Sequence, residues 1–135
     1  MQKILNLTMK KTFFCAIAAL MLMGCQKSLE ERAEQEARDY TRKFCPTPVY
    51  NHTRTDSLVF DRQSLTFIYY CTLTDFMDDA KLIEENRQML TDGLRQSIQE
   101  STGLKVYKDA GYSFRYVLRS EKSPDTILYE STFQM

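Results

Sequence analysis

The chain has 135 residues with 18 basic and 18 acidic side chains, and 43% of its residues are hydrophobic. The first 24 residues contain three lysines and no acid, so the remainder carries 15 basic and 18 acidic side chains. A mildly acidic chain without a basic stripe argues against nucleic-acid binding, which requires neutralising phosphates. Because only four residues are glycine and three are proline, the composition indicates one small ordered domain.

An export signal is predicted at residues 1–24. Lys10 and Lys11 precede an apolar run at 13–23, which is shorter than the roughly 20 residues that a membrane-spanning helix needs. Met9 would itself be a conventional start, so the true start, Met1 or Met9, stays open.

The run ends in Leu22-Met23-Gly24-Cys25, which resembles the bacterial lipobox. The resemblance implies that Cys25 becomes the mature N-terminus and binds the membrane through a thioether-linked diacylglycerol and an amide-linked acyl chain such as palmitate. An ordinary secretory signal is the alternative. Gln26 stands where inner-membrane lipoproteins of Gram-negative bacteria have Asp, so an outer-membrane lipoprotein is expected, facing either the periplasm or the surface.

The predicted organisation is a lipoprotein signal peptide at 1–24, a lipid anchor and short tether at 25–27, and a single α+β domain at 28–135. Cys15 leaves with the signal and Cys25 takes the lipid, so Cys45 and Cys71 remain. An exported compartment permits a disulfide between them. Two unpaired thiols are the main alternative, and a redox pair or metal site lacks both a Cys-x-x-Cys spacing and a second histidine.

The first predicted helix starts at the capping-box pattern Ser28-Leu29-Glu30-Glu31 and stops before Pro46. Its apolar stripe is Leu29, Ala33, Ala37, Tyr40 and Phe44. A second helix is predicted from about Asp78 to Thr102, with Gly103 as its C-terminal cap. Its apolar stripe, expected to be buried, is Leu82, Met89, Leu90, Leu94 and Ile98. Gly93 inside it suggests a close approach to the sheet.

Four strands are predicted from alternating or short apolar runs. Their ranges are 57–60, 65–73, 112–120 and 126–133. The order αββαββ predicts a two-layer α+β sandwich, a four-stranded, mainly antiparallel sheet with two helices on one face. A circular permutation of a ferredoxin-like chain would place the fourth strand between the second and the third, and a plain meander is the rival.

Candidate chemistry is sparse. His52 is the only histidine, and no Ser or Cys stands in a nucleophile motif, so we expect an exposed loop side chain and no catalytic residues. The acids at 75–85 lack the spacing of a calcium loop, and capping explains those at a helix start, so no metal and no cofactor are expected. We interpret the basic residues at 105, 108, 115 and 119 as solvated side chains, with anion or glycan binding as the alternative. We interpret the six tyrosines between 69 and 129 as packing residues, with sugar stacking as the alternative.

Two tripeptides, Asp56-Ser57-Leu58 and Asp125-Thr126-Ile127, are similar to the motif on which Bacteroides-type bacteria O-glycosylate exported proteins. Modification is therefore a hypothesis for Ser57 and Thr126. The chain also resembles small exported proteins of those bacteria in four segments, Cys45-Pro46, 53–57, 66–73 and 113–116. That group of proteins has no assigned active site.

The leading hypothesis is a non-enzymatic, lipid-anchored binding or accessory module of the cell envelope. Its partner would be an envelope protein or polymer and not nucleic acid. An envelope immunity or inhibitor protein is the second hypothesis. A small envelope hydrolase or redox enzyme is the third.

Overall fold

The computed structural model describes residues 26–135. The predicted signal peptide and Cys25 lie outside the described residues. No helix within the described range is both long and apolar enough to cross a membrane. The helices are α2 Leu29–Phe44, η1 Asp75–Met77, α3 Ala80–Glu85, α4 Arg87–Glu100, η2 Thr102–Leu104 and α5 Lys105–Asp109. The strands are β1 Thr53–Asp61, β2 Thr66–Leu73, β3 Ser113–Ser120 and β4 Ile127–Gln134.

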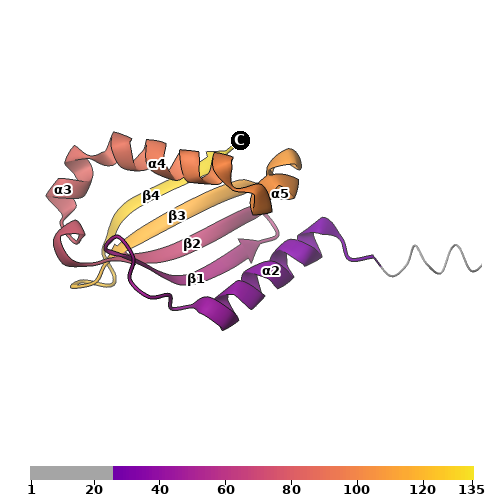
Figure 1. Cartoon of the computed structure of the whole chain (residues 1–135), viewed down its shortest axis with the longest axis horizontal. Helices are drawn as coiled ribbons and strands as arrows, with labels where there is room; N and C mark the ends of the chain where they lie inside the picture. The colour runs from indigo at the N-terminus through magenta and orange to yellow at the C-terminus, as the bar shows by residue number, and fades with distance from the viewer. Residues whose placement is uncertain (1–25) are drawn as a thin grey trace, which may run out of the picture.

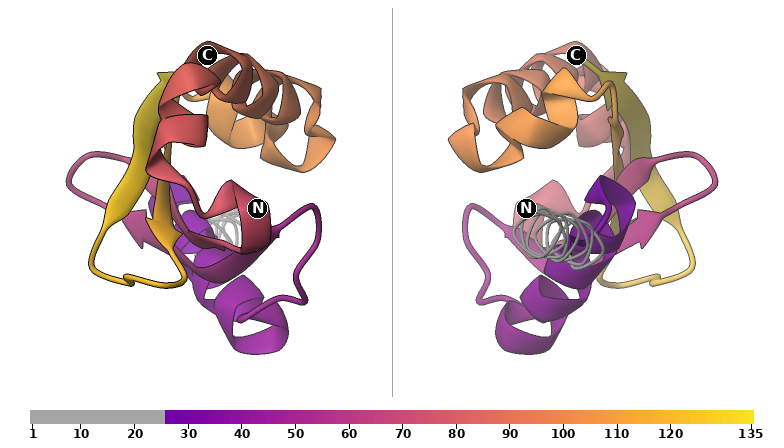
Figure 2. Two further views of the ribbon diagram at one scale, coloured as in Figure 1. Left: turned by 90° about the vertical axis from the view of Figure 1, so that its left-hand side faces the viewer. Right: turned by 90° about the vertical axis from the view of Figure 1, so that its right-hand side faces the viewer.

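The domain is the predicted α+β sandwich: a four-stranded sheet with the helices on one side of it (Figure 1; Figure 2). The strands lie in the order β1-β2-β3-β4, and the two outer pairs are antiparallel while β2 and β3 are parallel. The predicted placement of the fourth strand between the second and third is therefore wrong. The strands lie in the rival meander order, although the central pair is parallel rather than antiparallel. The physical reason is the long helical crossover from β2 to β3, which returns the chain to the end where β2 began.

Helix α2 begins and ends as predicted. The Ser28 hydroxyl accepts the Glu31 N–H at 3.2 Å, and the Cys45 N–H donates to the Thr41 carbonyl just before Pro46. Ala33 and Ala37 are buried, so small side chains let this helix lie close to the sheet. Phe44, predicted on the same stripe, is instead 59% exposed, and its ring lies against that of Tyr40 with centroids 5.4 Å apart.

The single second helix predicted at 78–102 is wrong in detail. The chain forms two helices there, α3 and α4, separated at Asn86, whose side chain donates to the Leu82 carbonyl at 2.8 Å. Such side-chain bonds to the backbone compete with helix continuation. Gly103 does not cap α4, because Ser101 does so and Gly103 belongs to η2. The short helix α5 was not predicted.

The core lies between the sheet and the helices, where the predicted alternation of β2 and β3 holds. Phe67, Cys71 and Leu73 of β2 and Phe114 and Leu118 of β3 are buried on this side. The tyrosines are mainly packing residues, as interpreted from the sequence. Tyr107, Tyr112 and Tyr129 are buried, and the rings of Tyr69 and Tyr116 stack with their centroids 4.6 Å apart.

Candidate binding groove

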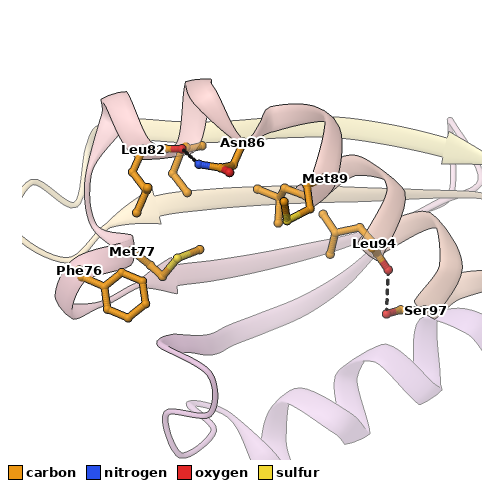
Figure 3. Close-up of a pocket in the computed structure, with 10 residues that line it drawn as sticks. Phe76, Met77, Leu82, Asn86, Met89, Leu94 and Ser97 are labelled. Carbon is orange, nitrogen blue, oxygen red and sulfur yellow. Dashed lines mark hydrogen bonds between the residues drawn. The ribbon is translucent and has the colours of Figure 1, made fainter.

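An apolar groove of about 580 Å³ lies on the helix side of the domain (Figure 3). Helix α4 forms one wall over about 16 Å, from Asn86 to Ser97, given a rise of about 1.5 Å per residue. The η1 segment closes one end with Phe76 and Met77. The volume falls within the range of small-molecule and peptide sites. The remaining lining residues are Leu82, Ile83, Met89, Leu90, Gly93 and Leu94.

The rim of the groove exposes large apolar side chains. Phe76 is 63% exposed and Met89 is 72% exposed, although a monomer gains stability by burying such groups. Met89 belongs to the stripe predicted to be buried, so its exposure corrects that expectation. Exposed apolar side chains that line one continuous groove are typical of an interaction site.

The polar side chains of the lining are already bonded within the chain. Asn86 Nδ2 donates to the Leu82 carbonyl at 2.8 Å, and Ser97 Oγ donates to the Gly93 carbonyl at 3.1 Å. Each of these two groups therefore has one partner within the chain. The rest of the lining presents mainly hydrocarbon and sulfur.

Gly93 opens the middle of the α4 wall. A Cβ atom built on Gly93 would have no heavy atom within 4 Å. The close approach to the sheet that the sequence suggested is therefore wrong, since this glycine borders empty space. A helix-interior glycine costs about 1 kcal/mol relative to alanine, and no neighbouring atom of the described fold requires it here.

The middle of the sheet face beside the groove is built from aromatic rings. Tyr69, Leu94 and Tyr116 are each partly buried and pack against both halves of the core. Burial raises the pKa of Tyr116 to about 12 and raises the pKa of Tyr69 further in the same direction. Both phenols therefore stay neutral at physiological pH.

His52 lies beside the η1 end of the groove. Its Nδ1 atom is 3.1 Å from Asp75 Oδ2, and its ring meets the Phe76 ring edge-on with centroids 4.4 Å apart. Asn51, His52 and Asp75 have φ angles of 50°, 58° and 53°, which are uncommon for residues other than glycine. The Thr74 N–H donates to the His52 carbonyl at 2.9 Å, so the two turns are held together. The sequence placed His52 correctly in a loop but did not predict this carboxylate partner.

Cys45 and Cys71 are both free thiols in the structure. Cys71 is buried and its Sγ lies 3.8 Å from Thr55 Oγ1, whereas Cys45 is partly exposed after α2. Burial raises the pKa of Cys71 to about 11 and also raises the pKa of Cys45. Pairing of these two residues stays a prediction.

The two hypothetical glycosylation residues lie in different settings. Ser57 is partly buried in β1 beside a bulge, and Thr126 is exposed in the turn before β4. Modification of either residue stays a hypothesis.

The acidic and basic clusters seen in the sequence separate in space. Asp79 caps α3 through the Lys81 and Leu82 N–H groups, and no three potential metal ligands gather within residues 26–135. Lys105 pairs with Asp109, and Arg115 pairs with Glu130. Lys108 instead donates to three carbonyls at the end of α4, so each of these three basic residues bonds to groups of its own chain.

The fold is a small two-layer α+β domain with an apolar groove on its helix side. The chain belongs to the family described as a domain of unknown function (DUF8479), whose model matches residues 28–129. No curated protein matches the chain significantly by sequence.

Two solved structures share the fold. One is a protein of Pseudomonas aeruginosa assigned as secreted, which is 14% identical, with a TM-score of 0.66 over 81% of this chain and 96% of that one. The other is the pilotin EpsS of the Vibrio vulnificus type 2 secretion system, which is 12% identical, with a TM-score of 0.59 over 78% of this chain and 87% of that one. At such identities the likeness concerns the fold alone.

Proposed function

We propose that this chain is a lipid-anchored, non-enzymatic accessory protein of the cell envelope that binds an apolar-faced helix of a partner envelope protein. The observation that carries the proposal is the groove beside α4, with Phe76 and Met89 exposed at its rim. The occurrence of the same fold in a secretion-system pilotin and in a protein assigned as secreted supports the envelope setting.

A helix fits the groove better than an extended segment does. An extended peptide must find partners for its backbone N–H and C=O groups, and the groove lining offers only two polar side chains, Asn86 and Ser97, each of which already bonds to a backbone carbonyl. A helix satisfies its own backbone and needs only an apolar surface, which the groove offers over about three turns. Met77 and Met89 add flexible side chains that adapt to the shape of a ligand.

The experiment places a photo-cross-linking amino acid at position 89 of the full-length chain in living cells. We expect an adduct with one envelope protein, whose cross-linked peptide contains an amphipathic helix. The matched position is Gln96, which is exposed on the same helix but does not line the groove. Equal yields at positions 89 and 96, or adducts with lipid alone, would contradict the proposal.

Gly93 supplies the matched variants. Gly93→Glu puts a charge into the groove at a position where the added Cβ has no heavy atom within 4 Å, so a synthetic peptide of the cross-linked segment should lose at least about tenfold in affinity. Gly93→Ala adds one methyl group and improves helix propensity, so it should raise unfolding stability by up to about 1 kcal/mol while retaining binding. Equal binding by the Gly93→Glu protein would exclude this groove as the site.

The anchor is tested separately by the intact mass of protein purified from membranes. The proposal expects a chain that begins at Cys25 and carries acyl chains, and a Cys25→Ser variant that stays unprocessed. A water-extractable chain without added mass would leave the groove proposal standing but would remove the lipid attachment.

A further inference from the structure

The two edge strands of the sheet, β1 and β4, differ in whether other residues bond to their outer side. Along β1, the Thr53 backbone pairs with Tyr50, and the Thr55 backbone pairs with the N–H and hydroxyl of Thr47. Further along, Leu58 pairs with the Thr41 hydroxyl, which accepts its N–H and donates to its carbonyl, both at 2.8 Å. Residues outside the sheet thus occupy three positions on the outer side of β1, and this edge is closed to another strand.

The β4 edge has no such cover. Within residues 26–135, the hydrogen bonds of the β4 backbone run to β3, and no loop or side chain bonds to its outer side. Helix α4 packs on the helix face of β4 rather than across its edge, where Thr91 Oγ1 lies 2.9 Å from the Tyr129 hydroxyl. β4 is the last strand of the sheet, at the margin opposite β1 (Figure 1).

The sequence of β4 also lacks the features that protect edge strands. Such strands usually carry lysine, proline, a bulge in mid-strand or an uncompensated charge. β4 has eight residues, and its single charge, Glu130, pairs with Arg115 of the same chain. Its one irregularity, opposite Leu118 and Arg119, lies at its start, so the stretch 129–134 pairs regularly with β3.

We propose that β4 is a homodimerisation edge, which pairs antiparallel with β4 of a second copy about a two-fold axis at Ser131. This register places Tyr129 opposite Phe133, so it pairs the regular stretch from 129 to 133 in both copies. It also sets Glu130 opposite Thr132. A two-fold axis at Glu130 would instead put two carboxylates directly opposite each other, which is unfavourable in paired strands.

A second copy is the occupant that this edge fits. In the Ser131 register, β4 of one copy matches β4 of the other in length, and no like charges face each other. Antiparallel pairing of two identical strands uses both β4 edges, so it gives a closed two-fold dimer and not a longer chain of copies. Growth is also blocked at the far edges, because β1 is covered in each copy. The product is one eight-stranded sheet with both grooves on the same side.

The experiment uses two differently tagged copies of the full-length chain, expressed together and extracted in detergent. The unaltered pair should co-purify. Ser131→Lys with itself, and Ser131→Asp with itself, should each lose at least about tenfold of the co-purified partner, because like charges meet at the axis. Combining Ser131→Lys with Ser131→Asp should restore the pair, which a general folding defect would not do.

The matched control is Val59→Lys, an equally drastic change at a 45% exposed position of the closed β1 edge, and it should leave co-purification unchanged. Circular dichroism establishes that each variant is folded. Three outcomes would overturn the proposal: no co-purification of the unaltered pair, full retention by the Ser131→Lys pair, or failure of the mixed charges to restore it. Loss of groove binding would not affect any of these results, since the groove lies on α4.

Discussion

The hydroxyl of Thr41 makes two 2.8 Å hydrogen bonds to Leu58, one from its N–H and one to its carbonyl. A single side chain of α2 thereby occupies a position that a neighbouring strand would otherwise take. The contact fixes the distance between α2 and β1 and covers backbone groups that are partly buried. It links the first helix to the first strand across 17 positions of sequence.

Replacing Thr41 should measure this contact. Thr41→Val keeps the shape of the side chain but leaves the Leu58 N–H and carbonyl without a partner, so it should lower the free energy of unfolding by about 1–3 kcal/mol. Thr41→Ser retains the hydroxyl and should cost less. Urea unfolding followed by circular dichroism gives both values, and equal stability of the two variants would contradict this role.

The end of α4 depends on Lys108. Its Nζ donates to the carbonyls of Ile98, Gln99 and Ser101 at 2.8–2.9 Å, where the helix dipole favours a cation. Lys108→Met should therefore destabilise the domain by about 1–2 kcal/mol. Lys105→Met removes only the exposed pair with Asp109 and should cost no more than about 0.5 kcal/mol. Similar thermal shifts for both variants would show that the carbonyl contacts add nothing.

Asp78 should make stability depend on acid. The Ser120 hydroxyl, and after it the Lys122 N–H that the Asp78 carboxylate accepts at 2.9 Å, lower the pKa of Asp78 below its usual value. A lowered folded pKa contributes stability above the unfolded pKa of about 3.9, and that contribution is lost as the pH falls through the folded value. Chemical unfolding should show the unaltered protein exceeding Asp78→Asn at pH 7, with the gap closing below about pH 4. A gap that is constant with pH would refute this.

The two thiols should differ in reactivity. Because burial raises the pKa of Cys71 to about 11, almost none of it is thiolate at pH 8. Iodoacetamide added to the folded, reduced protein should modify Cys45 first, and Cys71 should react readily only after unfolding. Peptide mass spectrometry locates the label. The same measurement without reductant tests the predicted disulfide, since a bonded pair would leave neither residue labelled.

Much of the architecture could be predicted from local pattern. Ser28 and Pro46 delimit α2, and the alternation around Phe67 and Phe114 identifies the central strands and the side they bury. These features depend on neighbours in the sequence, because capping, proline geometry and side-chain alternation act over a few residues. The sequence by itself therefore determined the α+β class and the one-sided packing of the helices.

The tertiary structure decided the strand order, the groove and the two kinds of edge. The parallel pairing of β2 with β3 depends on where the helical crossover returns the chain, and Asn86 and Lys108 shape that crossover through backbone contacts that periodicity does not reveal. Met89 has the spacing of a core residue, yet its exposure depends on how far α4 stands from its neighbours. Gly93 borders the groove, and Thr41 covers the outer side of β1. Both depend on segments that are distant in the sequence. Such relationships depend on contacts between residues far apart in the chain, and one sequence carries no local signal for them.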